Sequence, residues 1–258
     1  MNSTKRHPVW VLLCVGLLGF FAADMFRGER ILAQPPEGAG NQNLLNRIIE
    51  LETKLASVSV VGDDVIFEGV NVVVRNGGGA TDTINGTGNL IVGYDEVGDG
   101  PKSGSHNLVV GSKHTYTSFG GFVAGIQNTI SGENSSVSGG GSNTASGAGS
   151  SVSGGGFSEA SARLSTVSGG ASNAASGDFS TVSGGQSNRA KGGSSTVSGG
   201  FSNLASGPFS TVSGGRQNEA IGNDSTVSGG RLNLASGQSS TVSGGGGNTA
   251  AAQDSHVP

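Results

Sequence analysis

Residues 165–177 read Ser-Thr-Val-Ser-Gly-Gly-Ala-Ser-Asn-Ala-Ala-Ser-Gly, and units of this pattern return every 15 residues through the second half of the chain. One position of the unit holds valine in copy after copy, and we expect these valines to form the core. A register this strict predicts an array of stacked units instead of an ordinary globule. The predicted core residues are Val137, Val152, Val167, Val182, Val197, Val212, Val227 and Val242, preceded by Phe122 and followed by Val257.

Asparagine and alanine keep the same phase as valine. An asparagine follows each core valine by six residues, with Ser158 as the exception, and an alanine comes two residues later. Amides in register on stacked strands form hydrogen-bonded ladders, so we expect each amide to bond to the coils above and below it. The predicted ladder comprises Asn143, Asn173, Asn188, Asn203, Asn218, Asn233 and Asn248, preceded by Asn128.

Each unit is typical of two short strands closed by glycine turns. Successive side chains of a strand point to opposite faces, so Val167 and Ala175 should face a thin core while Thr166 and Ser168 face outward. Glycine pairs supply turns with positive φ and let neighbouring coils approach closely. Residues 86–258 are therefore predicted to form an all-β fold, a parallel β-solenoid or β-roll of 15-residue coils. A disordered Gly/Ser linker, the alternative, has no reason to keep register.

Composition agrees with a repeat array. Of the 258 residues, 49 are glycine, and aromatic residues make up 5%. Too few large side chains are present to fill a conventional core. The net charge is −4, and the repeats have no basic face, which argues against nucleic acid as a partner.

Residues 1–33 are typical of an export signal. A basic start at residues 5–7 precedes an apolar run from Val9 to Ala23, which has signal-peptide length and is short for a membrane-spanning helix. Cleavage after Ala33 and retention as an uncleaved signal anchor both stay open. Either way, we expect the rest of the chain to be exported, to a cell surface, an outer membrane or the medium.

After a polar linker at residues 34–43, residues 44–59 are predicted to form a short coiled-coil helix. Its apolar residues follow spacings of 4, 3, 4 and 3, which is a heptad pattern. A helix of about 15 residues is marginal alone in water, so its stripe needs a partner. We favour self-association over packing against the end of the solenoid, and two heptads do not decide between dimer and trimer. The predicted oligomerisation residues are Leu44, Ile48, Leu51, Leu55 and Val58.

Residues 60–85 are predicted to form a β neck or capping segment. Val70, Val72 and Val74 fall at every second position, as on one face of a strand, and residues 77–79 end the run with glycines. Asp63 and Asp64 are interpreted as a solvated turn. Residues 89–93 and 107–111 are near copies 18 residues apart, whose bulkier side chains suit terminal coils that close a stack.

The sequence offers little for catalysis. His106 and His114 lie near each other in the irregular coils and are interpreted as solvated loop histidines, and the acidic residues of the repeats form no recurring pair. The one cysteine, Cys14, lies in the apolar leader, and the aspartate-bearing nonapeptide of calcium-binding rolls is missing. We therefore expect no enzyme activity, cofactor or metal.

The unit at residues 165–177 resembles the repeats in the head domain of trimeric autotransporter adhesins, the YadA-like head, and the resemblance extends over about residues 86–258. It implies a homotrimer of parallel left-handed β-rolls on a cell surface, which binds extracellular matrix proteins, glycans or other cells. Stalks of that family usually follow the head, whereas here the heptad segment precedes it.

Two functions follow from these patterns. The first is a structural or adhesive surface module, in which a ligand would be distinguished at variable positions. The second is ice binding, because an outward array of hydroxyls is similar to the ice-binding faces of antifreeze β-solenoids. The variable positions are Phe157, Phe179, Phe201, Phe209, Arg216 and Arg231, and the threonines are Thr166, Thr181, Thr196, Thr211, Thr226 and Thr241.

Overall fold

The computed structural model describes residues 40–258, which form two compact units that meet in sequence between Val72 and Val73. The predicted export signal at residues 1–33 and most of the predicted linker lie outside the described residues. Within the described part of the chain, no helix has the length and apolar character needed to cross a bilayer.

The first unit contains the single described helix, α2 (Gly40–Lys54). It begins inside the predicted linker and ends before the predicted boundary at residue 59, so both bounds were wrong. Val58 lies in the following strand and does not continue the heptad stripe. The reason is local, because the β-branched residues Val58, Val60 and Val61 favour an extended chain over a helix.

An antiparallel hairpin of β1 (Val58–Val61) and β2 (Asp64–Phe67) completes the first unit. Its two-residue turn has Gly62 at φ +61°, as hairpin turns that match the strand twist require. Asp63 lies in this turn as expected, but Asp64 pairs with Val61 in the strand.

The strand predicted from Val70 to Val74 does not form. Its valines have the right alternation, but no strand of residues 40–258 pairs with them. Alternation supplies only a preference, and an extended segment needs a neighbour for its backbone groups.

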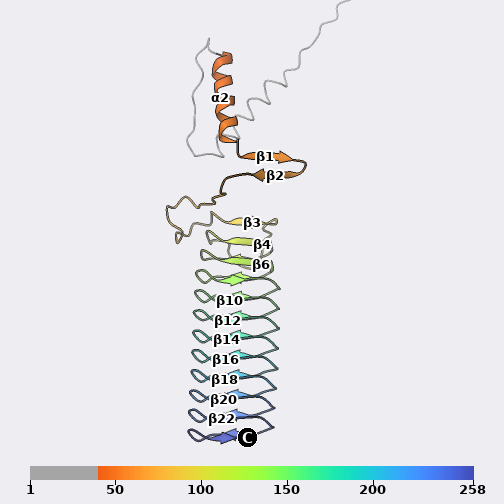
Figure 1. The fold of residues 1–258 in the computed structure, drawn as a ribbon, viewed down its shortest axis with the longest axis vertical. Coiled ribbons are helices and arrows are strands. Elements are labelled where there is room, and N and C mark those ends of the chain that lie inside the picture. The colour runs from red at the N-terminus through yellow and green to blue at the C-terminus, as the bar shows by residue number, and fades with distance from the viewer. Residues whose placement is uncertain (1–39) are drawn as a thin grey trace, which may run out of the picture. The chain divides into compact units, whose positions relative to one another are not determined.

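The second unit is a parallel β-solenoid with about 15 residues per coil, which confirms the predicted fold class (Figure 1). Each regular coil adds one strand to each of two parallel sheets. The 12-stranded sheet contains β3 (Leu90–Val92), β4 (Leu108–Ser112), β6 (Phe122–Ile126), β8 (Ser136–Val137), β10 (Ser151–Val152), β12 (Thr166–Val167), β14 (Thr181–Val182), β16 (Thr196–Val197), β18 (Thr211–Val212), β20 (Thr226–Val227), β22 (Thr241–Val242) and β24 (His256–Val257). The 10-stranded sheet contains β5 (Thr115–Tyr116), β7 (Thr129–Ile130), β9 (Thr144–Ala145), β11 (Glu159–Ala160), β13 (Ala174–Ala175), β15 (Arg189–Ala190), β17 (Leu204–Ala205), β19 (Glu219–Ala220), β21 (Leu234–Ala235) and β23 (Thr249–Ala250).

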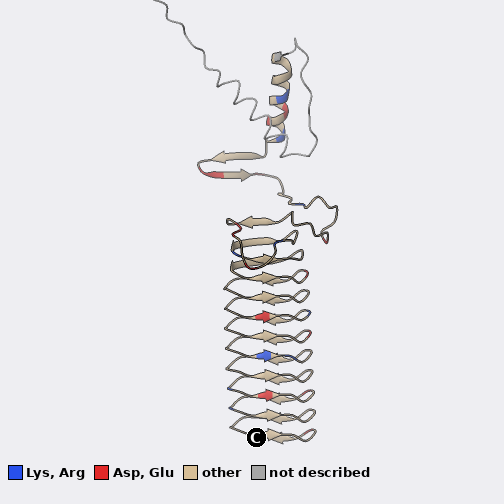
Figure 2. Ribbon diagram, turned by 180° about the vertical axis from the view of Figure 1, so that it is seen from behind, with Lys and Arg blue, Asp and Glu red and all other residues tan. Residues whose placement is uncertain are grey.

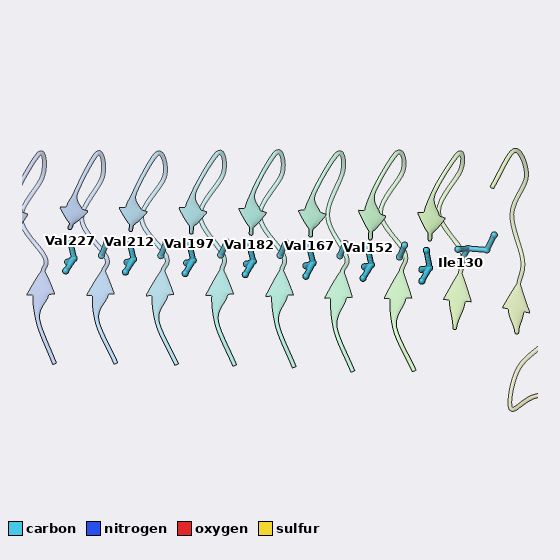
Figure 3. Close-up of a cluster of buried hydrophobic side chains, with 14 of the residues drawn as sticks. Ile130, Val152, Val167, Val182, Val197, Val212 and Val227 are labelled. Carbon is cyan, nitrogen blue, oxygen red and sulfur yellow. The ribbon is translucent and has the colours of Figure 1, made fainter. Parts of the chain in front are cut away.

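The core is a single column of valine from the first sheet facing a column of alanine from the second (Figure 3). The structure places the valines from Val137 to Val242 in parallel register with 0% of their surface exposed. Burying one valine contributes about 1.5–3 kcal/mol. A coil with so small a core depends on its hydrogen bonds to the coils on either side.

Val123, and not Phe122, occupies the core column ahead of Val137. Val123 pairs with Val137 and is fully buried, whereas Phe122 pairs with Ser136 and is only half-buried. The predicted step from the first core residue to Val137 was 15 residues, but the step from Val123 is 14. The reason is that Val123 and Asn128 are separated by one residue fewer than Val137 and Asn143. The missing residue is one glycine of the turn, so β6 runs on without interruption.

The asparagine column joins each coil to the next through backbone groups. The Asn188 Nδ2 donates to the Gly184 carbonyl of its own coil at 2.9 Å and to the Gly200 carbonyl of the following coil at 3.0 Å. Its Oδ1 accepts the backbone N–H of Asn203 at 2.9 Å. We expected each side chain to bond to both neighbouring coils, but it reaches only the following one. The preceding coil is joined through the Asn188 backbone N–H, which donates to Oδ1 of Asn173.

His114 is a member of this column and is not solvated, contrary to prediction. Only 1% of its surface is exposed, and its Nδ1 accepts the backbone N–H of Asn128 at 3.3 Å. Its Nε2 lies 3.0 Å from the Val110 carbonyl, which can only accept, so Nε2 carries the proton. The neutral imidazole thus provides the acceptor and the donor that an asparagine provides in the next coil.

A buried tyrosine replaces alanine in the first coil of the second sheet. The Tyr116 hydroxyl donates to Asp95 Oδ2 at 3.1 Å, and Asp95 also bonds to Lys102 Nζ at 2.7 Å. Burial, followed by the hydrogen bond to Asp95, raises the pKa of Tyr116 to about 12. This group ties residues 95–102 to the terminal coils.

Ser158 is the gap in the asparagine column, and filling it should stabilise the solenoid. Its Oγ accepts the Asn173 N–H at 3.3 Å, but it has no amide to donate to the glycine carbonyls. Ser158→Asn should raise the free energy of unfolding by about 1–2 kcal/mol, because one or two net hydrogen bonds are added. Urea unfolding followed by circular dichroism measures this, with Asn188→Ser expected to shift the midpoint downward. An unchanged or lower midpoint for Ser158→Asn would contradict the role given to the column.

Ionisation of the Tyr116 phenol at alkaline pH should lower the stability of the terminal coils. Its folded pKa lies above the ordinary value of 10.0, so the stability that the phenol contributes is present below pH 10 and is lost as the pH rises towards 12. The chain has two tyrosines, so Tyr94→Phe leaves Tyr116 as the one reporter of tyrosinate absorbance. We expect a midpoint near pH 12 in that variant and a lower one when Asp95→Asn is added. A midpoint near 10 in the single variant would show that the phenol is not held as described.

Candidate functional site

The outer surface of the solenoid has one uniform face and two variable regions. On the first sheet, the threonines that precede the core valines pair in register and are half-buried, and the serines that follow are exposed. On the second sheet, the outward residues change from coil to coil. Charged residues are sparse on both sheets (Figure 2), although Glu159, Arg189 and Glu219 face outward from the second one.

Besides the glycine pair, each coil has two further turn residues with positive φ, which we call the corner positions. One set follows the glycine pair, and the other precedes the buried serine that begins the next coil. The first set is Gln127, Ser142, Phe157, Ser172, Ser187, Ser202, Gln217, Leu232 and Gly247, and the second is Asn134, Gly149, Leu164, Phe179, Ser194, Phe209, Asp224, Ser239 and Asp254.

Five corner positions hold large apolar side chains in a conformation that disfavours them. Their φ angles lie between 53° and 61°, a region in which bulky residues are rare and which costs about 1–2 kcal/mol per residue. All five are exposed, and Phe157 and Phe209 show 75% and 61% of their surface. The other corners mostly carry serine, asparagine, aspartate, glutamine or glycine, most of which suit a turn better. The five residues are Phe157, Leu164, Phe179, Phe209 and Leu232.

Arginines accompany two of the exposed aromatic rings. The Arg163 guanidinium lies 4.6 Å from the ring centroid of Phe179, and that of Arg216 lies 5.6 Å from the ring centroid of Phe201. Both distances are within the range of a cation–π interaction. Phe201, Arg216 and Arg231 are successive members of one parallel ladder beside the first corner set. The six variable positions named from the sequence therefore all lie at or beside corners.

Sequence reasoning overlooked Leu164 and Leu232. The sequence signal that could have identified them is their position in the repeat unit, where most other coils have a small or polar residue. The strain itself could not be seen, since φ is a property of the folded turn.

The predicted oligomerisation residues are divided between the helix region and the strand that follows it. Leu44, Ile48, Leu51 and Leu55 are exposed along and just after α2, whereas Val58 belongs to β1. Lys54 donates a hydrogen bond to Glu50 and lowers the pKa of that carboxyl, which supports the last turn of the helix.

Chemical groups for catalysis are dispersed in the described chain. Among residues 40–258, no group of three or more His, Cys, Asp or Glu side chains could hold a metal ion. His106 and His114 hold backbone groups in place, and neither is paired with a nucleophile.

Two stretches of the chain, residues 195–207 and 210–222, match the family model described as ubiquitous surface protein adhesin repeat. No curated protein matches the chain in sequence. Each matched stretch begins at a buried serine and ends at a buried glycine, so it covers one coil up to the last residues before the next buried serine. The corner residues Pro208 and Phe209 lie between the two matches. Two consecutive coils are thus similar to a repeat of surface adhesins, which bears out the resemblance to the trimeric autotransporter adhesin repeat, whereas the YadA-like head stays an expectation.

Proposed function

We propose that the protein is an exported, non-enzymatic surface module that adheres to extracellular matrix proteins, glycans or other cells through the corners of its solenoid. The observation that carries this proposal is the set of large apolar side chains held exposed at strained corner positions. Strain of this kind persists where the surrounding structure imposes it, and it is typical of functional positions. Exposed aromatic residues beside arginines are also the side chains that dominate binding at protein interfaces.

The repeat match and the architecture support this proposal. Residues 195–222 carry the unit of a surface adhesin repeat. A solenoid of hydrogen-bonded coils is stiff, so corner residues in different coils keep their spacing when a partner binds. Several weak contacts on one rod then act together and raise the overall affinity.

We further propose that residues 40–72 assemble the chain into a homotrimer. A 15-residue helix and an isolated hairpin are each marginal alone in water. Both expose their apolar side chains, including Ile48 on the helix and Val60 and Phe67 on the hairpin. Heptad spacing on α2 lets parallel copies cover this stripe.

Ice binding is the second candidate. The observation in its favour is the register of the hydroxyl face, in which Thr166 to Thr241 pair coil by coil in parallel. These threonines are only half exposed, and serine takes the place of a second threonine column. Thermal hysteresis and inhibition of ice recrystallisation by the purified chain would favour this candidate over adhesion.

Replacing a corner phenylalanine should separate stability from adhesion. Phe209→Asn places a residue that tolerates positive φ at the corner, so we expect unfolding to require about 1 kcal/mol more free energy. The triple variant Phe157→Asn, Phe179→Asn, Phe209→Asn should lose binding to immobilised collagen, fibronectin or laminin, measured by surface plasmon resonance. Ser194→Asn, in the same corner set, is the control and should bind like the wild type. Undiminished binding by the triple variant would exclude the corners as the adhesive surface.

The mass of the full chain in solution tests the proposed trimer. Light scattering should give three times the mass of one chain. Ile48→Asp should reduce the measured mass to that of a single chain, because a charge would be buried in the apolar seam. Asn46→Asp adds the same charge on the opposite, polar side of the helix and should leave the trimer intact. A wild-type monomer would refute the assembly while leaving adhesion by the corners open.

A further inference from the structure

A pocket of about 340 Å³ lies in the second unit, between the glycine-rich loop of residues 75–81 and His106. Asn76 holds this loop in shape and is itself buried. Its Oδ1 accepts the Gly78 N–H at 2.8 Å, its backbone carbonyl accepts the Asn85 Nδ2 at 2.8 Å, and its Nδ2 donates to the carbonyl of Thr83. The loop is therefore built before any ligand arrives.

His106 closes the loop and has no free ring nitrogen. Its Nδ1 lies 2.9 Å from the Thr81 carbonyl, which can only accept, so this nitrogen carries the proton. Its Nε2 accepts the backbone N–H of Asn76 at 3.2 Å. With both nitrogens engaged, His106 acts as a wall of the pocket and offers a ligand no acceptor.

What the pocket does offer is N–H donors. Among the described residues, the backbone N–H groups of Gly77, Gly79, Ala80 and Thr81 have no hydrogen-bond acceptor. Gly77 and Gly79 have φ of +77° and +87° on either side of Gly78, and such alternation turns successive N–H groups towards one concave site. Arg75 lines the same pocket and is exposed.

No carboxylate of residues 40–258 lines this pocket to compete for the donors. A concave site with several free N–H groups, one arginine and no acidic wall selects an anion. The arginine fork and paired N–H groups match the oxygen atoms of a carboxylate or a sulfate. A volume of about 340 Å³ is at the small end of ligand sites, which suits a single sugar ring bearing that anion.

We propose that this pocket binds the oxyanion of an acidic sugar, either a carboxylate or a sulfate ester. Arg75 and the backbone N–H groups of residues 77–81 hold the anion, and the Thr81 side chain and backbone donors around the rim contact the sugar hydroxyls. The site does not involve the corner positions, so its test is independent of the test of adhesion by the solenoid.

Saturation-transfer NMR on the full-length chain tests the proposal with glucuronate, glucose 6-sulfate and glucose as probes. We expect saturation-transfer signals from at least one of the two acidic sugars and none from glucose. The acidic sugar with the stronger signal identifies whether the pocket prefers a carboxylate or a sulfate ester. Arg75→Gln should weaken binding about tenfold, because a charge-assisted hydrogen-bond pair is lost. Lys191→Gln removes an equal charge from an exposed position far along the sequence and should bind like the wild type.

Sodium sulfate should displace the acidic sugars more effectively than sodium chloride of the same ionic strength. Equal displacement by both salts would show that only general electrostatic attraction is present, and this would overturn the proposal. So would equal binding by wild type and Arg75→Gln, or binding of glucose as strong as that of glucuronate. Circular dichroism of Arg75→Gln identical to wild type would show that the loss comes from the pocket, since Arg75 is exposed.

Discussion

The hydrogen bond from an asparagine amide to a glycine carbonyl of the next coil is the contact on which the solenoid depends. In one coil the Asn203 Nδ2 donates to the Gly215 carbonyl at 2.9 Å. Gly200 lies beside this hydrogen bond and has φ +88°. A Cβ atom on Gly200 would lie 2.2 Å from the Gly215 oxygen. A side chain at that position would push the coils apart and break the amide contact. The asparagine and the second glycine of each pair therefore meet one requirement, the close approach of adjacent coils.

Because the inward residues and the glycine pairs are so constrained, the sequence varies at the outward and corner positions of each coil. One valine and one alanine fill the core, the asparagine is occupied by backbone contacts, and in some coils the buried serine hydroxyl donates to a backbone carbonyl, as Ser165 does to Ala162. The outward residues of the second sheet and the corner residues are exposed or half-buried. The family match covers both kinds of position, because it includes the corner residues Ser202 and Gln217 and leaves out Pro208 and Phe209. Side chains can thus change at the corners without loss of the fold.

The irregular coils at the start of the solenoid meet the same requirement with larger side chains. His114 replaces an asparagine, Tyr116 replaces an alanine, and Ile130 fills the alanine column of the next coil. Larger groups bring individual hydrogen bonds, such as Tyr116 to Asp95. The described chain therefore has a repeated surface on its regular coils and a pocket at residues 75–81 and His106, outside those coils.

The sequence by itself determined the solenoid, its core valines and its outward positions. In a stack, residue and neighbour are separated by one period, so a local pattern also specifies the contacts between coils. Only the tertiary structure decided the features outside that period. The 14-residue step at Val123, the burial of His114 and the pairing of Asn76 with His106 depend on contacts between segments that do not repeat. The failure of Val70–Val74 to form a strand has the same cause, since alternation cannot show whether a partner strand is within reach.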